Sequence, residues 1–229
     1  SIYDDPVLAG LRLELKILEN ELADKTAEKD EYEHYINQFN QEYLLRVGEL
    51  LEQILQLKLS QSAANSEEYA QIKESFDDFE QEYIQSKQEP LAANLNEEQE
   101  AELKKAYRQA SRLCHPDRLA PELQTKGAEF FKELSNAYRR NDLSRVKEIL
   151  TALQINGGLQ TISDRTYDKE SLLQQISLLK ERIEQLTNNI KEMLQSEIYQ
   201  HIQSLHDRAE YFVNLKQELT QELIALQTT

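Results

Sequence analysis

Apolar residues recur at alternating spacings of four and three residues from Leu11 to Leu57. The repeat occupies these positions: Leu11, Leu15, Leu18, Leu22, Lys25, Lys29, Tyr32, Ile36, Phe39, Tyr43, Val47, Leu50, Ile54 and Leu57. Lys25 and Lys29 interrupt its apolar character. This heptad spacing is typical of a helix that packs along a second helix, so we predict one long helix here. Gly48 lies off the repeat, and we expect it to mark the close approach of another helix.

The heptad repeat changes phase between Ser60 and Ser66, and a second apolar stripe follows from Tyr69 to Tyr83. Pro90 closes this stripe, because the residue before a proline disfavours the helical conformation. We predict a turn, with Ser66 as the N-cap of a second helix. A continuous helix with a slipped register is the alternative.

Three shorter amphipathic patterns occupy the middle of the chain. Asn96 and the glutamine three residues later match the capping box that begins a helix, and Pro116 stops that helix. The apolar spacing over residues 130–138 predicts a second helix. Asp142 is placed to cap a third, which the glycines at 157–158 end.

A second long repeat runs from Leu172 to Leu226, with a slip near residues 195–198 that resembles a four-residue stutter. Two long helical segments therefore flank the compact middle. The most economical arrangement is an antiparallel coiled-coil hairpin with the middle segment near its far end. A parallel homodimer joined through the same repeats is the alternative.

The predicted fold is all-α, with a compact helical module inserted between two long helices. We predict N-terminal coiled-coil helices over residues 1–90, the module over residues 91–158 and a C-terminal coiled-coil helix over residues 159–229. The composition favours this interpretation, because only 5 Gly and 4 Pro occur in 229 residues.

Charge is distributed unevenly along the chain. The net charge of −16 argues against nucleic acid or an anionic membrane as the main partner, since both would repel the protein. Between Leu95 and Leu153, however, 11 basic residues face 10 acidic ones, while the remainder holds 15 basic and 32 acidic residues. A nearly neutral module thus lies within an acidic chain.

Cys114 is the only cysteine, which excludes an internal disulfide and suits a reducing compartment. No apolar run approaches the roughly 20 residues of a membrane-spanning helix, and no signal-peptide pattern opens the chain. We therefore expect a cytoplasmic protein without a membrane partner.

The chemistry of the module is concentrated in one basic helix and the loop that follows it. The helix reads LKKAYRQASRLC over residues 103–114, and the loop is His115-Pro116-Asp117 followed by Arg118. The next helix contains EFFKELSNAYRR over residues 129–140.

This order resembles the J-domain of DnaJ-type co-chaperones. In that family a basic helix with Lys-Lys-Ala-Tyr-Arg leads into His-Pro-Asp and a basic residue, and the next helix has a Phe-Lys-Glu core and an Ala-Tyr pair. The resemblance covers residues 94–153, about a quarter of the chain. The first helix of the family, with its aromatic-Leu-Gly signature, is not recognisable here, and the helix ending at Tyr83 or residues 91–95 are candidates to replace its packing.

The resemblance implies that the module docks on the nucleotide-binding half of a DnaK-class chaperone and promotes its ATP hydrolysis. It implies these partner-binding residues: Lys104, Lys105, Arg108, Arg112, His115, Pro116, Asp117 and Arg118. The protein would then be no enzyme, with no catalytic residue, metal or cofactor of its own, and its coiled coil would recruit or position a client protein. We expect the basic face of the helix to point outward beside a rigid polar tip, which suits an acidic partner surface.

Other interpretations remain open. The basic helix face could be an ordinary solvated face, and the chain could be a structural adaptor that uses the J-like fold only for protein–protein interaction. Cys114 beside His115 could suggest a metal site or a nucleophile, but no second ligand pair or oxyanion loop accompanies them. The aromatic cluster at Tyr32, Tyr35, Phe39 and Tyr43 is interpreted as helix packing, with a client-binding patch as the alternative.

Overall fold

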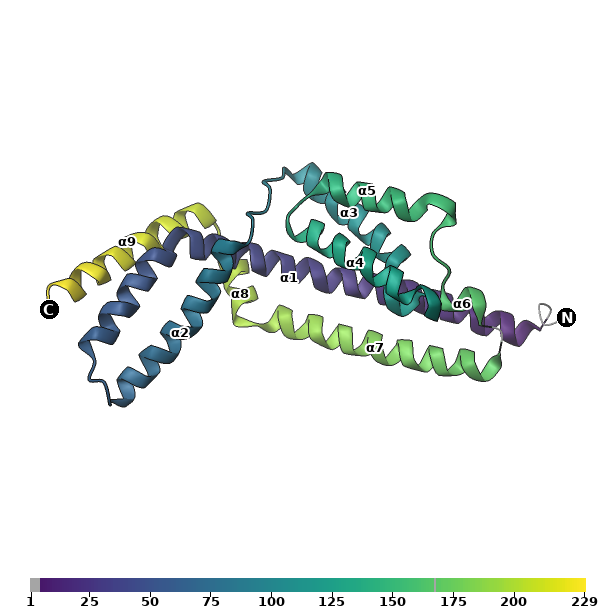
Figure 1. Cartoon of the computed structure of the whole chain (residues 1–229), viewed down its shortest axis with the longest axis horizontal. Helices are drawn as coiled ribbons and strands as arrows, with labels where there is room; N and C mark the ends of the chain where they lie inside the picture. The colour runs from purple at the N-terminus through teal and green to yellow at the C-terminus, as the bar shows by residue number, and fades with distance from the viewer. Residues whose placement is uncertain (1–4, 167) are drawn as a thin grey trace. The chain divides into compact units, whose positions relative to one another are not determined.

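The computed structural model describes residues 5–166 and 168–229, leaving aside the side chain of Asn156 (Figure 1). Its α-helices are α1 (Pro6–Gln61), α2 (Glu67–Gln88), α3 (Glu97–Cys114), α4 (Gln124–Arg139), α5 (Leu143–Gln154), α6 (Ile162–Arg165), α7 (Lys169–Gln195), α8 (Glu197–Ser204) and α9 (Arg208–Gln227). Short 3-10 turns are η2 (Pro116–Arg118), η3 (Pro121–Leu123) and η4 (Ile155–Gly157). The chain is 86% helical with no strands in its described part, which confirms the all-α class and the helical module between long helices.

Side-chain caps fix the helix boundaries that the sequence predicts. The Ser66 hydroxyl accepts a hydrogen bond from the Tyr69 amide at 3.1 Å, so α1 and α2 are separated by a turn. The Asn96 side chain and Gln99 form the expected capping box at the start of α3. The Asp142 side chain accepts a hydrogen bond from the Arg145 amide at 3.0 Å at the start of α5. These boundaries are set locally, because each cap satisfies a backbone amide left free at a helix end.

The chain divides into two compact units that do not follow chain order. The first comprises Ser1–His34 and Leu91–Gln195, and the second comprises Tyr35–Pro90 and Ser196–Thr229. The long helix α1 contributes its first half to one unit and its second half to the other. The boundaries predicted at 90/91 and 158/159 stay predictions.

Within the first unit, α7 lies along the first half of α1 (Figure 1). One buried apolar cluster joins the two helices and α6 through Leu15, Leu18, Leu22, Ile162, Leu172, Ile176, Leu179 and Ile183. Lys180 of α7 pairs with Glu14 of α1 at 2.9 Å. Both helices begin at the same end, so they run parallel. The prediction of an antiparallel pair is wrong.

The direction of α7 follows from the segment that leaves the helical module. Positive φ angles at Gly157 and Gly158 turn the chain, and α6 brings it back to the start of α1. There the buried Glu19 carboxylate accepts hydrogen bonds from the backbone amide of Ser163 at 2.8 Å and from its hydroxyl at 2.9 Å. The next helix therefore starts beside the beginning of α1 and runs in the same direction.

The second unit packs the later half of α1 with α2, α8 and α9. Phe39 is buried against Phe212 with ring centroids 5.6 Å apart, and Tyr35 and Tyr43 pack on the same cluster. At these three positions the aromatic residues serve helix packing, as interpreted from the sequence. A Cβ atom on Gly48 would lie only 2.5 Å from the Tyr83 ring, which confirms the close helix approach predicted there.

The second long repeat forms three helices. Ser196 caps α8 directly after α7, and α8 ends at Ser204 before Asp207 caps α9. The predicted slip near residues 195–198 is therefore a real helix break. None of the helices in the described ranges has the length and apolar character needed to cross a lipid bilayer.

Candidate partner-docking site

The helical module is built on α3, which has one apolar and one basic face. Its buried side includes Leu103, Tyr107 and Ala110, and these pack against α4 and α5. Tyr107 stacks on Tyr138 of α4 with ring centroids 4.2 Å apart. The spacing of three and four residues places these side chains on one face, because a helix turns every ~3.6 residues.

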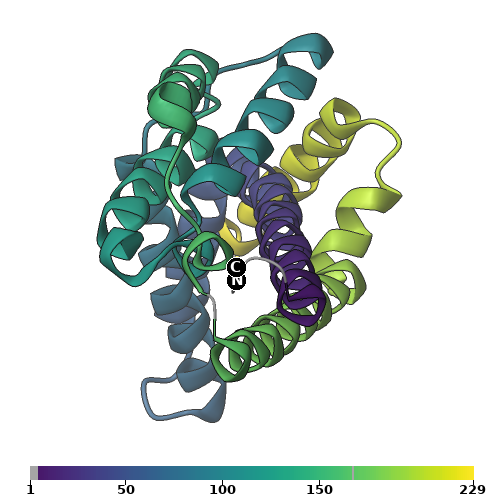
Figure 2. The same cartoon turned by 90° about the vertical axis from the view of Figure 1, so that its right-hand side faces the viewer.

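The third helix of this core is α5, which follows the loop and α4 in the chain. Val146, Ile149 and Leu153 of α5 are buried in one cluster with α3 and α4, and Leu95 packs on its edge. Figure 2 shows α3, α4 and α5 together on one side of the first half of α1, with α7 on another. Leu95 thus joins the packing as expected, whereas α5 supplies most of the apolar residues that pack against α3 and α4.

The loop after α3 forms the 3-10 turn η2. His115 is only 7% exposed, and its Nδ1 accepts a hydrogen bond from the Asp117 amide at 3.2 Å. Its ring packs edge to face against the Phe131 ring of α4, with the ring centroids 5.2 Å apart. Pro116 occupies the first position of the turn, where its fixed φ angle suits the helical conformation. The loop is therefore held in one conformation by α3 and α4.

Close contact between α4 and the end of α3 also supports the loop. A Cβ atom on Gly127 would lie 2.2 Å from Cδ1 of Leu119 and 2.8 Å from the Cys114 carbonyl oxygen. Only glycine allows this approach without a shift of the backbone. The spacing of apolar residues in the sequence does not indicate that position 127 requires glycine.

The neutral form of His115 is fixed by its hydrogen bonds. The Thr26 hydroxyl of α1 donates to the Leu22 carbonyl at 2.8 Å, so its oxygen accepts from Nε2 of His115 at 3.1 Å. Nδ1 is then the acceptor and Nε2 carries the proton. Burial lowers the pKa of His115, which is consistent with a neutral ring.

The two charged residues of the loop, Asp117 and Arg118, also meet long helices. Asp117 forms an ion pair with Arg182 of α7. Arg118 is 6% exposed and donates to the Asn20 side chain of α1 at 2.9 Å. Its Nε finds no acceptor in the described part of the chain, so one donor of a buried guanidinium is unsatisfied.

The basic face of α3 divides into two parts. Lys104 and Lys105 are exposed, as the sequence predicts. Arg108 forms a two-pronged ion pair with Glu31 of α1, with distances of 2.7 and 3.0 Å from Nε and Nη2 to the two carboxylate oxygens. Arg112 does the same with Asp24 at 2.7 Å on both prongs. Both arginines are exposed, as the sequence predicts, and acidic residues of α1 also reach them.

Sequence reasoning missed this side of α1. Ala23, Ala27, Asp30 and His34 follow one another at spacings of four, three and four, so they form a second stripe beside the heptad repeat. Ala27 is buried in the core cluster of α3, α4 and α5. The sequence gives one weak indication of this second stripe: Lys25 and Lys29 interrupt the apolar heptad repeat beside it.

Two further side chains of this stripe bind the module. The Tyr107 hydroxyl donates to Oδ2 of Asp30 at 2.5 Å. His34 hydrogen-bonds the Asn141 side chain at 2.7 Å and lies against the Tyr138 ring at 4.8 Å. We call Lys104, Lys105, Arg108, Arg112 and residues 115–118 the docking face.

Two observations bear on the metal site and the nucleophile considered at Cys114. Cys114 is fully buried, and burial raises its pKa to about 12, so the thiol is not activated as a nucleophile. No group of three or more potential metal ligands comes together among the residues that the structure describes.

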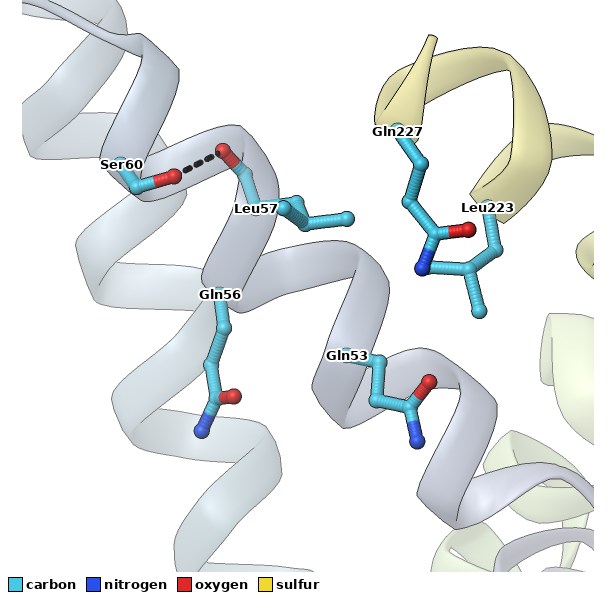
Figure 3. Close-up of a pocket in the computed structure, with 6 residues that line it drawn as sticks. All are labelled: Gln53, Gln56, Leu57, Ser60, Leu223 and Gln227. Carbon is cyan, nitrogen blue, oxygen red and sulfur yellow. Dashed lines mark hydrogen bonds between the residues drawn. The ribbon is translucent and has the colours of Figure 1, made fainter.

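A hollow of about 360 Å³ in the second unit lies between α1 and α9 (Figure 3). It is lined by Gln53, Gln56, Leu57, Ser60, Leu223 and Gln227. The Ser60 hydroxyl donates to the Leu57 carbonyl at 2.8 Å. This lining contains no acid or base that could activate the hydroxyl, so it does not support catalysis.

Comparison with known proteins places the module in a family. Residues 94–145 match the family model of the DnaJ domain. Comparison with curated protein sequences and with solved structures gave no match. The matched range contains the basic helix α3, the loop at His115 and helix α4, which are the residues whose geometry is described above. The chain therefore carries a DnaJ domain, the module of J-domain co-chaperones, between residues 94 and 145.

Proposed function

We propose that the protein is a J-domain co-chaperone that docks on a DnaK-class chaperone through the docking face and stimulates its ATPase. The observation that carries the proposal is the DnaJ-domain match over residues 94–145 with an intact His115-Pro116-Asp117 loop. In this proposal ATP is hydrolysed on the chaperone, and the protein supplies no catalytic group. Its role is to bias the conformation of the partner.

Charge supports the choice of partner surface. Lys104 and Lys105 stay exposed on α3, and Arg108 and Arg112 keep about half of their side-chain surface exposed, at 48% and 50%. A cationic face of this kind accelerates encounter with an acidic surface. The long helices of the second unit would recruit or position a client protein, in the cytoplasm.

The test is the steady-state ATPase rate of a DnaK-class chaperone with and without the protein. The wild-type chain is expected to raise the rate, and His115→Gln is expected to abolish the rise. His206→Gln is the matched control, because His206 is exposed on the second unit. A rate that the wild-type chain leaves unchanged for every cognate chaperone would refute the proposal.

A structural adaptor is the second candidate, and one observation favours it. His115 is buried and its ring nitrogen is bonded to Thr26, so the loop takes part in internal packing. An adaptor would keep its function in the His115→Gln variant. It would lose function when Leu179 or Ile183, which are buried between α1 and α7, is replaced by glutamate.

A further inference from the structure

Helix α1 presents an acidic surface to the docking face of the DnaJ domain. Residues 19–34 contain seven acidic residues and two lysines. Asp24 and Glu31 lie seven positions apart, which is about two helical turns, and they meet two arginines of α3 that lie one turn apart. Each carboxylate uses both oxygens on one guanidinium, which is the most specific geometry that such a pair adopts.

Contacts from α1 and α7 also engage the loop itself. The Thr26 hydroxyl accepts a hydrogen bond from Nε2 of His115, and the Asn20 side chain accepts one from Arg118. Arg182 forms an ion pair with Asp117. Both the arginines of α3 and the polar residues of the loop are thus occupied by side chains of the same chain. Lys104 and Lys105 are exposed, and Arg108 and Arg112 stay about half-exposed beside their α1 partners.

The covering helix contributes one residue to the buried core cluster of the domain. Helices α3, α4 and α5 bury their apolar faces against one another, and Ala27 is the α1 residue in that buried cluster. The remaining contacts of α1 with the domain that are described above are mainly polar. Ion pairs with half-exposed arginines contribute little to stability. The contact is therefore specific in geometry but weak enough to open.

We propose that the acidic face of α1 is an intramolecular competitor of the chaperone, which holds the DnaJ domain closed until α1 leaves the docking face. This inference rests on the proposed function, since it regulates the same site. In the closed form α1 takes the place of the acidic surface of the partner. Stimulation then requires the two-pronged pairs at Asp24 and Glu31 to break.

The test compares ATPase stimulation by the full chain with stimulation by the Asp24→Lys/Glu31→Lys double variant. These substitutions lie on α1 and leave every residue of the docking face unchanged. The double variant is expected to reach half-maximal stimulation at a protein concentration about tenfold lower, which corresponds to an opening free energy of about 1.4 kcal/mol. Adding His115→Gln is expected to remove the gain.

Two further variants control for charge and folding. Glu49→Lys/Glu74→Lys changes the net charge equally at exposed positions outside residues 19–34 and is expected to behave as the wild type. Asp24→Asn/Glu31→Gln removes the charges with little change in shape and is expected to give an intermediate gain. It replaces the charge-reversal variant if circular dichroism shows that the latter does not fold.

The outcomes separate the two proposals. A gain in the α1 variants together with wild-type behaviour of the charge control supports closure. Equal stimulation by the wild type and by both α1 variants overturns closure and leaves the proposed function standing. If no variant stimulates any DnaK-class chaperone, the proposed function fails and closure falls with it.

Discussion

The hydroxyl of Tyr107 donates a hydrogen bond of 2.5 Å to Oδ2 of Asp30, joining α3 to α1. Burial raises the pKa of Asp30 from its ordinary 3.8 to about 6. The same burial and the neighbouring carboxylate raise the pKa of Tyr107, so its hydroxyl keeps the proton. The folded chain therefore binds a proton at Asp30 more tightly than the unfolded chain does.

The first prediction concerns the pH dependence of this bond. The stabilising contribution of Asp30 is present below pH 3.8 and is lost as the pH rises through about 6. Asp30→Asn keeps an acceptor for Tyr107 and removes the titration. The free energy of unfolding of the wild type is expected to fall by about 1–2 kcal/mol relative to the variant across this window. Urea unfolding on both sides of the window checks it, and parallel curves for the two proteins would contradict it.

His115 gives a prediction of the opposite sign. Burial lowers its pKa below the ordinary 6.5, so the folded chain binds this proton less tightly than the unfolded chain does. Its contribution to stability is present above pH 6.5 and is lost as the pH falls below that value. The wild type is therefore expected to lose stability on acidification relative to His115→Gln. His206→Gln is the control, and it should follow the wild type over the same pH range.

Ser163 supports the third prediction. Its amide and hydroxyl both donate to the buried Glu19 carboxylate. Ser163→Ala removes the hydroxyl and leaves one carboxylate oxygen with one donor fewer, which should cost about 1–3 kcal/mol of unfolding free energy. Ser144→Ala, at an exposed position of α5, should change it by no more than about 0.5 kcal/mol. Similar unfolding midpoints for the two variants would show that the bond to Glu19 contributes nothing.

Two glycines of α1 provide the fourth prediction. Alanine normally stabilises a helix interior by about 1 kcal/mol relative to glycine. Gly10→Ala should show part of this gain, because nothing lies within 4 Å of the added Cβ. Gly48→Ala should instead destabilise by about 1–3 kcal/mol, because the Tyr83 ring would have to move.

The position of that ring explains why the clash cannot be relieved cheaply. Tyr83 stacks on Phe79 with centroids 5.4 Å apart, and Nζ of Lys87 lies 3.8 Å from its centroid on the ring face. Thermal unfolding of both glycine variants checks the prediction. A stabilised Gly48→Ala variant would mean that the ring shifts at no cost.

Several features of the fold could be predicted because their causes are local. The side chains of Ser66 and Asn96 each accept a hydrogen bond from the backbone amide three residues later. Neighbouring residues in the sequence are therefore enough to predict these caps. The DnaJ domain was predictable for a similar reason, since its basic helix and loop are contiguous from Leu103 to Arg118.

The direction of α7 and the cover on the docking face could not be predicted in this way. An apolar repeat is satisfied by a parallel or an antiparallel neighbour. The segment before α7 returns to α1 at the bond between Glu19 and Ser163, which lie 144 positions apart. The pairs of Arg108 and Arg112 with α1 are likewise distant in sequence and have no apolar period. Polar contacts between distant segments produce no periodic pattern in either segment, so neither segment alone predicts them.

The pairing of Arg108 with Glu31 has a consequence for how the closed domain would respond to its surroundings. The two residues lie 77 positions apart in one chain, so the effective concentration of the acidic helix beside the domain is set by the intervening segment and does not depend on the amount of protein. Dilution would therefore not open the domain. The chaperone would compete against a fixed local concentration, and its own abundance would set the threshold at which the domain is used.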